Sequence, residues 1–386
     1  MNDFDQFIYK IENNLNFRVA LKEWCKADFL TYLGYVFYLI NGSKFKLKPF
    51  HRLVISKLQS LVECKNTKRN LALCLPVGSG KSLIIEYFIT WCFARSINNT
   101  FCYNSHSDRL INRLSKECKD IIENPYWILL FEHHLKKDDR QRVNFSFEGA
   151  KNRTGLTAGT TGGAITGLDA GNPNIQGFSG ALIIDDPMDA GNARYEKSRD
   201  EVVVFYDEKL STRRRTPTTP TILIMQRLHL DDLIGWIEKN EPDIWDIVKV
   251  PALDENGKSF WQERYPVDEL KHIQSINNFK FQAQYQQEPI ASGGAVIKTE
   301  WFKYYPQNVE YQYKRIFITG DTAQKVKEHN DFSVFMVWGV TKLGKLHLLD
   351  EVRGKWEAPD LKRQVKILWN RWSNGIGNTA CSGLYI

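Results

Sequence analysis

Apolar runs of four or five residues recur between residues 48 and 250, and turns and helical stretches separate them. Runs of this length, with helices between them, are typical of strands that are buried on both faces of a parallel sheet. We therefore predict an α/β domain over 48–250. A glycine-rich stretch at 157–163 has the composition of a turn between short strands. The predicted strands are 71–75, 101–104, 181–184, 221–225 and 247–250.

A second pattern of apolar runs begins near residue 313. The runs 316–321, 333–338 and 345–350 follow one another closely and predict three consecutive strands. A helix is expected after them, over 359–372. The sequence therefore predicts a second, β-rich unit over 313–386.

The remaining segments differ in composition from these two units. The first 47 residues are rich in Phe, Tyr and Trp and predict a helical lead-in, with a buried helix at 29–40. The residues between the two units are polar and rich in glutamine, which favours a linker. The expected organisation is a lead-in at 1–47, an α/β domain at 48–250, a linker at 251–312 and a β-rich domain at 313–386.

The first predicted strand leads into a glycine turn that ends in Gly80, Lys81 and Ser82, and an apolar helix follows. Such a turn cradles phosphates, because its backbone N–H groups and the helix N-terminus point toward the anion. Lys81 would reach the β- and γ-phosphates of ATP, and the Ser82 hydroxyl would bind Mg²⁺. The usual pattern opens with a glycine where this chain has Leu75. The loop residues expected to contact the nucleotide are Pro76, Val77, Gly78, Ser79, Gly80, Lys81 and Ser82.

A pair of carboxylates ends the predicted strand 181–184. In the sheet of an NTPase, the first of them, Asp185, would hold Mg²⁺, and the second, Asp186, would polarise the water that attacks the γ-phosphate. An Asp-Asp-Pro turn that merely ends a strand is the alternative interpretation. The phosphate loop upstream favours a P-loop ATPase.

Polar residues also follow the predicted strand 221–225. Gln226 and Arg227 stand at its C-terminal end, where α/β sheets bind their ligands. We expect Gln226 or Arg227 to sense the γ-phosphate. A strand followed by a helix that Asp231 caps fits the same residues, and both interpretations can hold.

The net charge of the 386 residues is +7, which mildly favours an anionic partner. Eight Lys and Arg residues crowd segment 44–69, where Glu63 is the one acidic residue, and Arg213, Arg214 and Arg215 form a second cluster. For each cluster alone, a solvated surface is an equally good explanation. Seven scattered cysteines without a Cys-x-x-Cys pair predict buried free thiols in a reducing compartment. No apolar run is long enough to span a bilayer, so we expect a soluble, cytoplasmic protein that does not contact a membrane.

Several motifs, in this order, resemble the large terminase subunit of tailed bacteriophages. The resemblance covers about 45–386 and implies a P-loop ATPase of the RecA/ASCE type that uses ATP and Mg²⁺ to pump double-stranded viral DNA into a procapsid. It also implies a portal ring, a small terminase subunit and a ring of identical subunits as partners, in the cytoplasm of a bacterial host. The motifs are Gly-Lys-Ser at 80–82, Leu-Ile-Ile-Asp-Asp-Pro at 182–187, Ile-Met-Gln-Arg-Leu-His at 224–229, Phe-Gln-Ala-Gln-Tyr-Gln-Gln at 281–287, Gly-Gly at 293–294 with Trp-Phe at 301–302, and Asp-Thr-Ala at 321–323.

The resemblance further implies a C-terminal endonuclease with an RNase H-like fold. Asp321 ends one predicted strand, and Asp350 ends another that we expect to lie beside it. Two carboxylates at adjacent strand ends can hold a pair of Mg²⁺ or Mn²⁺ ions about 4 Å apart. Asp331 is a further candidate ligand. For each of these residues alone, a strand-end cap is the commoner explanation.

The sequence departs from the family pattern in three places. Residues 77–79 contain no Arg, although family members often carry one there. We therefore expect Arg227, or one of residues 213–215 of a neighbouring copy, to supply the positive charge that stabilises the transition state. The spacer between Gly167 and Asp185 is longer than usual. The third nuclease carboxylate is missing, since no Asp or Glu follows Asp360. We therefore expect a truncated nuclease domain with weak or absent DNA cleavage.

Two other functions remain open. A helicase-type, DNA-dependent ATPase would need a second RecA-like half and strand-separation motifs, and we find neither. A non-catalytic prophage remnant would explain the early end of the nuclease domain. The intact Lys81, Asp185 and Asp186 argue against long decay.

Overall fold

The computed structural model of the chain has two compact units, Met1–Val296 and Ile297–Ile386, and each has its own sheet and buried core. The residues that it describes are 3–137, 143–151, 154–163, 167–290, 301–306, 309–322, 332–376 and 379–385.

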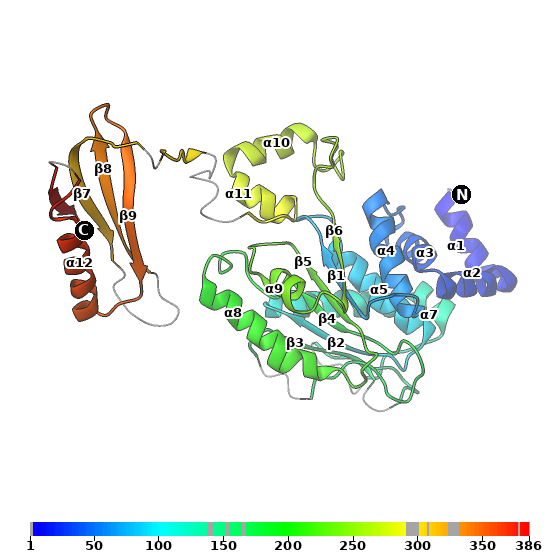
Figure 1. Ribbon diagram of the computed structural model, residues 1–386. Coiled ribbons are helices and arrows are strands. Elements are labelled where there is room, and N and C mark those ends of the chain that lie inside the picture. Colours follow the sequence, from blue (N-terminus) through cyan, green and yellow to red (C-terminus); the bar gives the residue numbers. More distant parts are fainter. Residues whose placement is uncertain are drawn as a thin grey trace. The chain divides into compact units, whose positions relative to one another are not determined.

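The first unit contains a six-stranded sheet in which all neighbouring strands are parallel, in the order β3-β2-β4-β5-β1-β6 (Figure 1). All five predicted strands are present, and the predicted α/β fold is confirmed. One strand, β5, separates β1, which leads into the phosphate loop, from β4, which ends in Asp185. This is the strand order of RecA/ASCE-type P-loop domains. The strands are β1 (Asn70–Cys74), β2 (Thr100–Ser105), β3 (Gly155–Thr160), β4 (Leu182–Asp185), β5 (Thr221–Met225) and β6 (Trp245–Lys249).

Strand β3 corrects the prediction of a turn over 157–163, because residues 157–160 belong to the strand and the turn is confined to 161–163. It pairs with β2 along its full length, from Gly155 opposite Thr100 to Thr160 opposite Ser105. Gly155 has a φ of +113°, and a Cβ atom there would collide with the carbonyl oxygen of Phe145. Glycine is therefore needed for the close approach of a neighbouring chain segment rather than for a turn.

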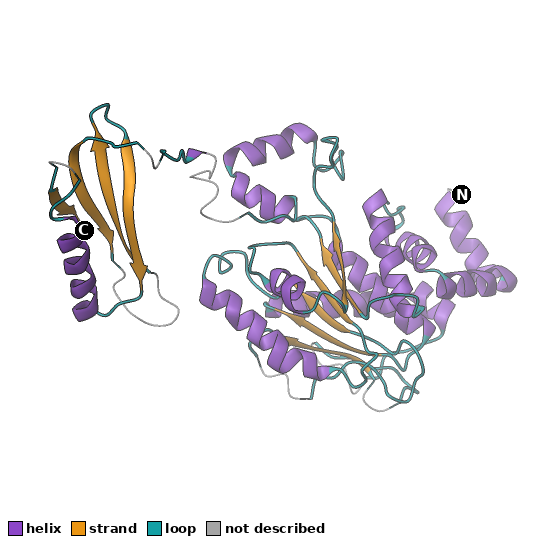
Figure 2. Ribbon diagram, viewed as in Figure 1, coloured by secondary structure: helices purple, strands orange, loops and turns teal. Residues whose placement is uncertain are grey.

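Helices cover both faces of this sheet (Figure 2). Side chains alternate between the faces, so Leu71 and Leu73 of β1 belong to one core, while Ala72 and Cys74 belong to the other. The result is a three-layer arrangement in which the carboxyl ends of all six strands meet at one edge. The first face is covered by α4 (Pro49–Val62), α5 (Lys81–Arg95), α6 (Asp108–Ile122) and α7 (Pro125–Phe131), and the second by α8 (Glu196–Val204), the π-helical segment Phe205–Leu210 with the short 3₁₀ turn Ser211–Arg213, and α9 (Leu233–Asn240).

Three N-terminal helices, α1 (Asp3–Asn13), α2 (Leu15–Ala27) and α3 (Phe29–Asn41), join the first of these cores. The ring of Phe29 stacks on Trp91 of α5 at 5.0 Å, and the Trp91 Nε1–H donates a hydrogen bond of 2.8 Å to the carbonyl oxygen of Cys25. The buried helix predicted at 29–40 is confirmed as α3.

Most of the segment predicted as a linker is folded and packs with the first unit. It contains α10 (Val267–Ile276), α11 (Asn278–Lys280) and the π-helical segment Phe281–Tyr285. The N–H of Ala252 donates to the carbonyl oxygen of Tyr285 at 2.9 Å, and the N–H of Arg227 donates to Oε1 of Gln287 at 2.9 Å. The first bond closes the segment on itself just after β6, and the second ties its end to the residue that follows Gln226 after β5.

The second unit is built on a four-stranded sheet in the order β10-β7-β8-β9. Strands β7, β8 and β9 are antiparallel neighbours, and β10 returns after a helix to lie parallel to β7. This order is that of the first four strands of an RNase H-like sheet, so the predicted fold class is confirmed here too. The elements are β7 (Tyr313–Asp321), β8 (Ser333–Thr341), β9 (Leu346–Gly354), α12 (Ala358–Trp372) and β10 (Cys381–Tyr385).

Across the described residues, no helix combines the length and the apolar character that a membrane crossing requires. All seven cysteines are free thiols, and Cys64 is the exposed one among them. Burial raises the pKa of Cys74 and of Cys102 to about 12. These thiols therefore stay protonated and act as small core residues, as the sequence predicted.

Candidate active site

The loop between β1 and α5 has the backbone conformation of a phosphate-binding turn. Gly78 and Gly80 have φ values of +71° and +83°, a region that favours glycine. Lys81 begins α5, whose first N–H groups have no intrahelical partner. Ser79 is fully buried, and its Oγ has no hydrogen-bond partner among the described residues. The loop therefore offers several unused donors at one point.

Leu75 stands where a glycine usually opens this motif, and the structure explains why. Its N–H donates to the carbonyl oxygen of Met225 at 3.1 Å, and its side chain is fully buried in the core. The pairing of β1 with β5 therefore continues through residue 75, and the turn begins at Pro76. A side chain at this position fills the core and leaves the loop intact.

His51 of α4 holds the loop in place through a hydrogen bond. Its Nδ1 accepts a hydrogen bond from the N–H of Lys48, so Nε2 carries the proton and donates to the carbonyl oxygen of Ser79 at 3.0 Å. Burial is the main cause that lowers the pKa of His51, which keeps the ring neutral. No local sequence pattern predicts this contact, because His51 lies 28 residues before Ser79.

Lys81 and Asp186 form an ion pair, with 2.9 Å between Nζ and Oδ1. Asp186 has a φ of +43°, a strained conformation for a residue other than glycine. Its N–H donates to the carbonyl oxygen of Ile224, and its own carbonyl oxygen accepts hydrogen bonds from the backbone and the ring of His106. The ends of three strands thus hold the strained carboxylate beside the phosphate loop.

Asp185 is almost completely buried at the end of β4. The Tyr103 hydroxyl donates to its Oδ2 at 2.7 Å, whereas its Oδ1 has no partner in the described part of the chain. Burial, and next the negative charge of Asp186, raise the pKa of Asp185. A cation close to Oδ1 would relieve both effects. The orphaned carboxylate oxygen therefore fits a Mg²⁺ ligand, and the Ser82 hydroxyl at the start of α5 supplies a second oxygen of suitable chemistry.

Two further strand ends present polar atoms without partners. Within the described ranges, neither Oγ of Ser105 at the end of β2 nor Oε1 of Gln226 directly after β5 has a hydrogen-bond partner. Both atoms are inaccessible to solvent. A buried polar atom without a hydrogen-bond partner lowers the free energy of unfolding, because it has lost its hydrogen bonds to water. Their concentration at the carboxyl edge of the sheet, where α/β proteins bind ligands, marks this edge as the candidate active site.

Arg227 is already engaged within the first unit. Its Nε lies 3.0 Å from both carboxylate oxygens of Asp232, and its Nη1 lies 3.5 Å from Oε2 of Glu238. The Arg227 side chain is 3% exposed. Asp232 also caps α9 by accepting from the N–H of Gly235 at 3.0 Å. Asp232, rather than the predicted Asp231, is therefore the cap, and Arg227 would have to leave a buried ion pair to reach a nucleotide.

The arginine cluster 213–215 is half-buried at the end of the 3₁₀ turn. Arg215 pairs with Asp169 at 3.1 Å, and the Nε of Arg213 donates to the carbonyl oxygen of Lys209. Nε of Arg214 donates to the carbonyl oxygen of Ser211. These contacts are all made within the first unit, so the three arginines help to stabilise its fold.

The basic segment 44–69 also has several internal partners. Lys48 pairs with Glu263 and Lys57 with Asp246, while Lys68 donates to the carbonyl oxygen of Pro242. These contacts join α4 and the start of β1 to β6 and the segment that follows it. Part of this positive charge therefore stabilises the unit itself.

The prediction that the strand of Asp350 lies beside that of Asp321 is wrong. Strand β8 separates β7 from β9, because each strand of an antiparallel meander pairs with its predecessor. Val337 of β8 pairs with both Ile318 and Asp350, so Asp350 is level with a residue three positions before Asp321. Strand β10 is the other neighbour of β7.

Asp350 has structural partners. Its Oδ2 accepts hydrogen bonds of 2.9 Å from Trp372 Nε1 and from Arg371 Nη1. Burial raises the pKa of Asp350, but these hydrogen bonds outweigh that effect and leave the pKa below its ordinary value. The third candidate, Asp331, lies outside the described residues. Among the residues that are described, no three His, Cys, Asp or Glu side chains form a group that could hold a metal ion.

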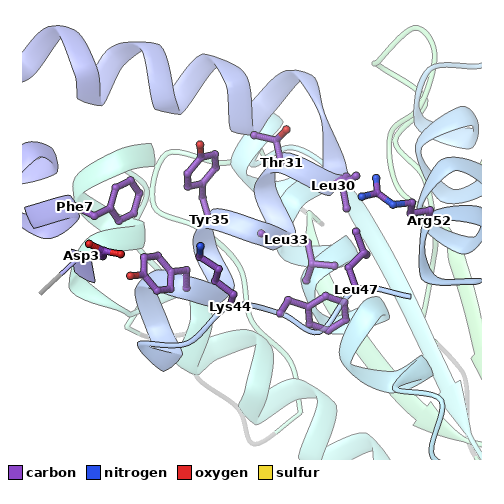
Figure 3. Close-up of a pocket in the computed structure, with 12 residues that line it drawn as sticks. Asp3, Phe7, Leu30, Thr31, Leu33, Tyr35, Lys44, Leu47 and Arg52 are labelled. Carbon is purple, nitrogen blue, oxygen red and sulfur yellow. The ribbon is translucent and has the colours of Figure 1, made fainter. Parts of the chain in front are cut away.

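A cavity of about 550 Å³ lies in the N-terminal helical region, between α1, α3 and the segment before α4 (Figure 3). Phe7, Leu33 and Tyr35 give it apolar walls, and Lys44 and Arg52 add positive charge. No residue of the phosphate loop and neither Asp185 nor Asp186 lines it. We assign the chemistry to the sheet edge, because the unpaired polar atoms and the paired carboxylates converge there.

No protein-family model and no curated protein matches the sequence. Similar solved structures exist. The large terminase of bacteriophage HK97 is 13% identical with a TM-score of 0.44, over 89% of this chain and 71% of that one. The ATPase domain of the Thermus phage P74-26 large terminase is 13% identical with a TM-score of 0.39, over 66% of this chain and 98% of that one. The Phi-28 gp11 DNA-packaging motor is 14% identical with a TM-score of 0.32, over 82% and 92%.

The chain resembles phage large terminases. The likeness extends over 66–89% of this chain at 13–14% identity.

Removal of the Asp232 carboxylate tests the buried ion pair. In Asp232→Ala, the charge of Arg227 stays buried with Glu238 as its one remaining acidic partner among the described residues, and α9 loses its cap, so we expect a loss of about 3–5 kcal/mol in the free energy of unfolding. The matched control is Asp231→Ala, which breaks an exposed pair with Lys239 and should cost less than about 1 kcal/mol. Urea unfolding of the full chain measures both. Equal losses would contradict the assignment of Arg227 to the core.

Asp185→Asn tests the electrostatics of the carboxylate pair. A raised folded-state pKa means that Asp185 favours folding when protonated, and this contribution is lost as the pH rises through about 6. The Asn variant should therefore be more stable than the wild type at pH 7.5, by on the order of 2 kcal/mol, with a gain that shrinks toward pH 5. Urea unfolding across this pH range measures the gain. Asp186→Asn, which breaks the pair with Lys81, should show no such gain, and a pH-independent effect at Asp185 would refute the account.

Proposed function

We propose that the chain is the ATPase of a viral DNA-packaging motor, a large terminase subunit. The observation that carries the proposal is the ion pair between Lys81 of the phosphate loop and Asp186, beside the orphaned oxygen of Asp185. A basic residue, two acids and unused donors at one sheet edge suit a triphosphate with a divalent cation. Likeness to terminases, one of which from a thermophilic phage is solved with ADP and with ATP-gamma-S, agrees with this proposal.

The roles of the residues follow from their places. The N–H groups of 77–80 and the start of α5 would hold the phosphates, and Lys81 would exchange its contact with Asp186 for the β- and γ-phosphates. Ser82 and Asp185 would hold Mg²⁺, which neutralises phosphate charge when bound. Asp186, released from Lys81, would accept the proton of the attacking water.

Gln226 is proposed to sense the γ-phosphate. It follows β5, the strand between the phosphate loop and the carboxylates, and its Oε1 has no partner among the described residues. The next residue, Arg227, has its N–H bonded to Gln287. A movement of Gln226 on loss of the γ-phosphate would therefore be passed through Arg227 to Gln287, in the segment after β6.

Double-stranded DNA is the proposed polymer, and lysines and arginines would contact its phosphates without reading base sequence. Lys44, Lys46 and Arg52 are exposed basic side chains of the segment 44–69 and are candidates for this contact. A portal ring, a small terminase subunit and further copies of the chain are the proposed protein partners.

For the second unit we propose weak or absent endonuclease activity. The observations that support this are the pairing of Asp350 with Arg371 and Trp372 and its distance in register from Asp321. A two-metal site needs carboxylates that face one another and have free oxygens.

Lys81→Ala tests the ATPase. Because Lys81 would contact the phosphates, we expect ATP turnover by the full chain to fall about 100-fold or more. The matched control is Lys57→Ala, whose lysine pairs with Asp246 away from the loop and whose loss should leave turnover unchanged. Double-stranded DNA should stimulate the wild type. Stimulation by single strands alone would favour a helicase, and absence of turnover would favour a non-catalytic remnant.

The endonuclease proposal is tested by incubating the purified chain with supercoiled plasmid and Mn²⁺. We expect little or no nicking within hours, because Asp350 already accepts hydrogen bonds from Arg371 and Trp372. Asp321→Asn serves as the matched control and should leave any residual nicking unchanged. Robust cutting that Asp321→Asn abolishes would show an intact metal site and refute the proposal.

A further inference from the structure

The segment 259–265, which follows β6, lies directly against the phosphate loop. The Tyr265 hydroxyl donates a hydrogen bond of 2.9 Å to the carbonyl oxygen of Val77. A Cβ atom on Gly78 would collide with the same hydroxyl and would lie 3.3 Å from Nη2 of Arg264. The guanidinium of Arg264 is therefore in contact range of the middle of the loop, although 186 residues separate it from Gly78 in the sequence.

Arg264 is held in place by rings and not by a carboxylate. Its guanidinium carbon lies 5.4 Å from the ring centroid of Trp261 and 5.9 Å from that of Tyr265. No hydrogen bond or ion pair joins its side chain to any other described residue. The nearest acid in sequence, Glu263, is paired with Lys48. Arg264 is exposed, so its N–H donors are open to a ligand.

The segment that carries Arg264 is fixed before any ligand binds. Trp261 meets the His51 ring edge-on at 5.3 Å, and the Phe260 ring lies 5.2 Å from Phe50. The N–H of Tyr265 donates to the carbonyl oxygen of Trp261 at 2.8 Å. His51 is also the residue that supports Ser79, so one cluster of rings positions both the loop and the arginine.

Two other cations considered for this site, Lys81 and Arg227, are already paired with acids. Lys81 pairs with Asp186, and Arg227 pairs with Asp232 and Glu238. Residues 75–80 contain no cationic side chain. A bound triphosphate carries several negative charges, and a guanidinium with two parallel N–H donors matches phosphate oxygens well.

We propose that Arg264 is a phosphate ligand of the nucleotide site, supplied in cis by the segment after β6. The inference rests on the proposed ATPase function and names the source of the positive charge that the loop lacks. Arg264 would donate its N–H groups to phosphate oxygens bound next to Gly78. The rings of Trp261 and Tyr265, against which the guanidinium packs, would orient it.

The test compares Arg264→Ala, Arg264→Lys and the matched control Lys258→Ala in the full chain. Lys258 is an exposed cation directly before this segment, with no contact to the loop among the described residues. ATP turnover gives kcat and KM, and titration with ATP-gamma-S gives the affinity for a triphosphate. We expect Arg264→Ala to lower kcat/KM about 100-fold and the ATP-gamma-S affinity about tenfold or more. Arg264→Lys should recover part of the loss, and Lys258→Ala should match the wild type.

The outcomes separate this inference from the proposed function. If the wild type hydrolyses ATP and Arg264→Ala does so equally well, the inference is overturned and the ATPase stands. If the wild type hydrolyses no ATP, the proposed function fails and the titration decides alone. Weaker ATP-gamma-S binding by Arg264→Ala would then still support a phosphate ligand, whereas unchanged binding, or no binding by either protein, would overturn it.

Discussion

A buried carboxylate next to a partly buried one is the constraint around which the first unit is organised. Asp185 ends β4 and Asp186 follows it directly, so the charge of Asp186 repels a carboxylate that is 2% exposed. Such a pair is tolerable only with cations and donors close by. Lys81 supplies the cation and Tyr103 supplies a donor, and both reach the pair because the strands are parallel and end at one edge.

The same arrangement leaves buried polar atoms without hydrogen-bond partners among the described residues, and a ligand can supply those partners. Oδ1 of Asp185, Oγ of Ser79 and Oε1 of Gln226 are buried without partners among the described residues, and Asp186 keeps a strained backbone. A protein selected for stability alone would remove these features. Here they lie in the phosphate loop and at the strand ends of the same sheet edge, and His51, which packs against Trp261, bonds to the carbonyl oxygen of Ser79.

The sequence predicted those features that short-range patterns encode. Five buried strands of the first sheet, the glycine turn and the paired acids follow from local runs of residues, and all are present. Strand β3 was missed because Gly155 serves close packing, which composition does not reveal. The separation of Asp350 from Asp321 depends on strand order in a meander. Arg264 was missed because its contact with Gly78 spans most of the first unit, and no periodicity connects such distant residues.

The most direct test of the central claim is a structure of the full chain determined with Mg²⁺ and ATP-gamma-S. The account predicts triphosphate density in the loop 75–82 and a metal ion bound by Ser82 and Asp185. It also predicts that Lys81 has moved from Asp186 to the phosphates. Nucleotide bound elsewhere, such as in the N-terminal cavity, or an unchanged contact between Lys81 and Asp186 under saturating ligand, would contradict it.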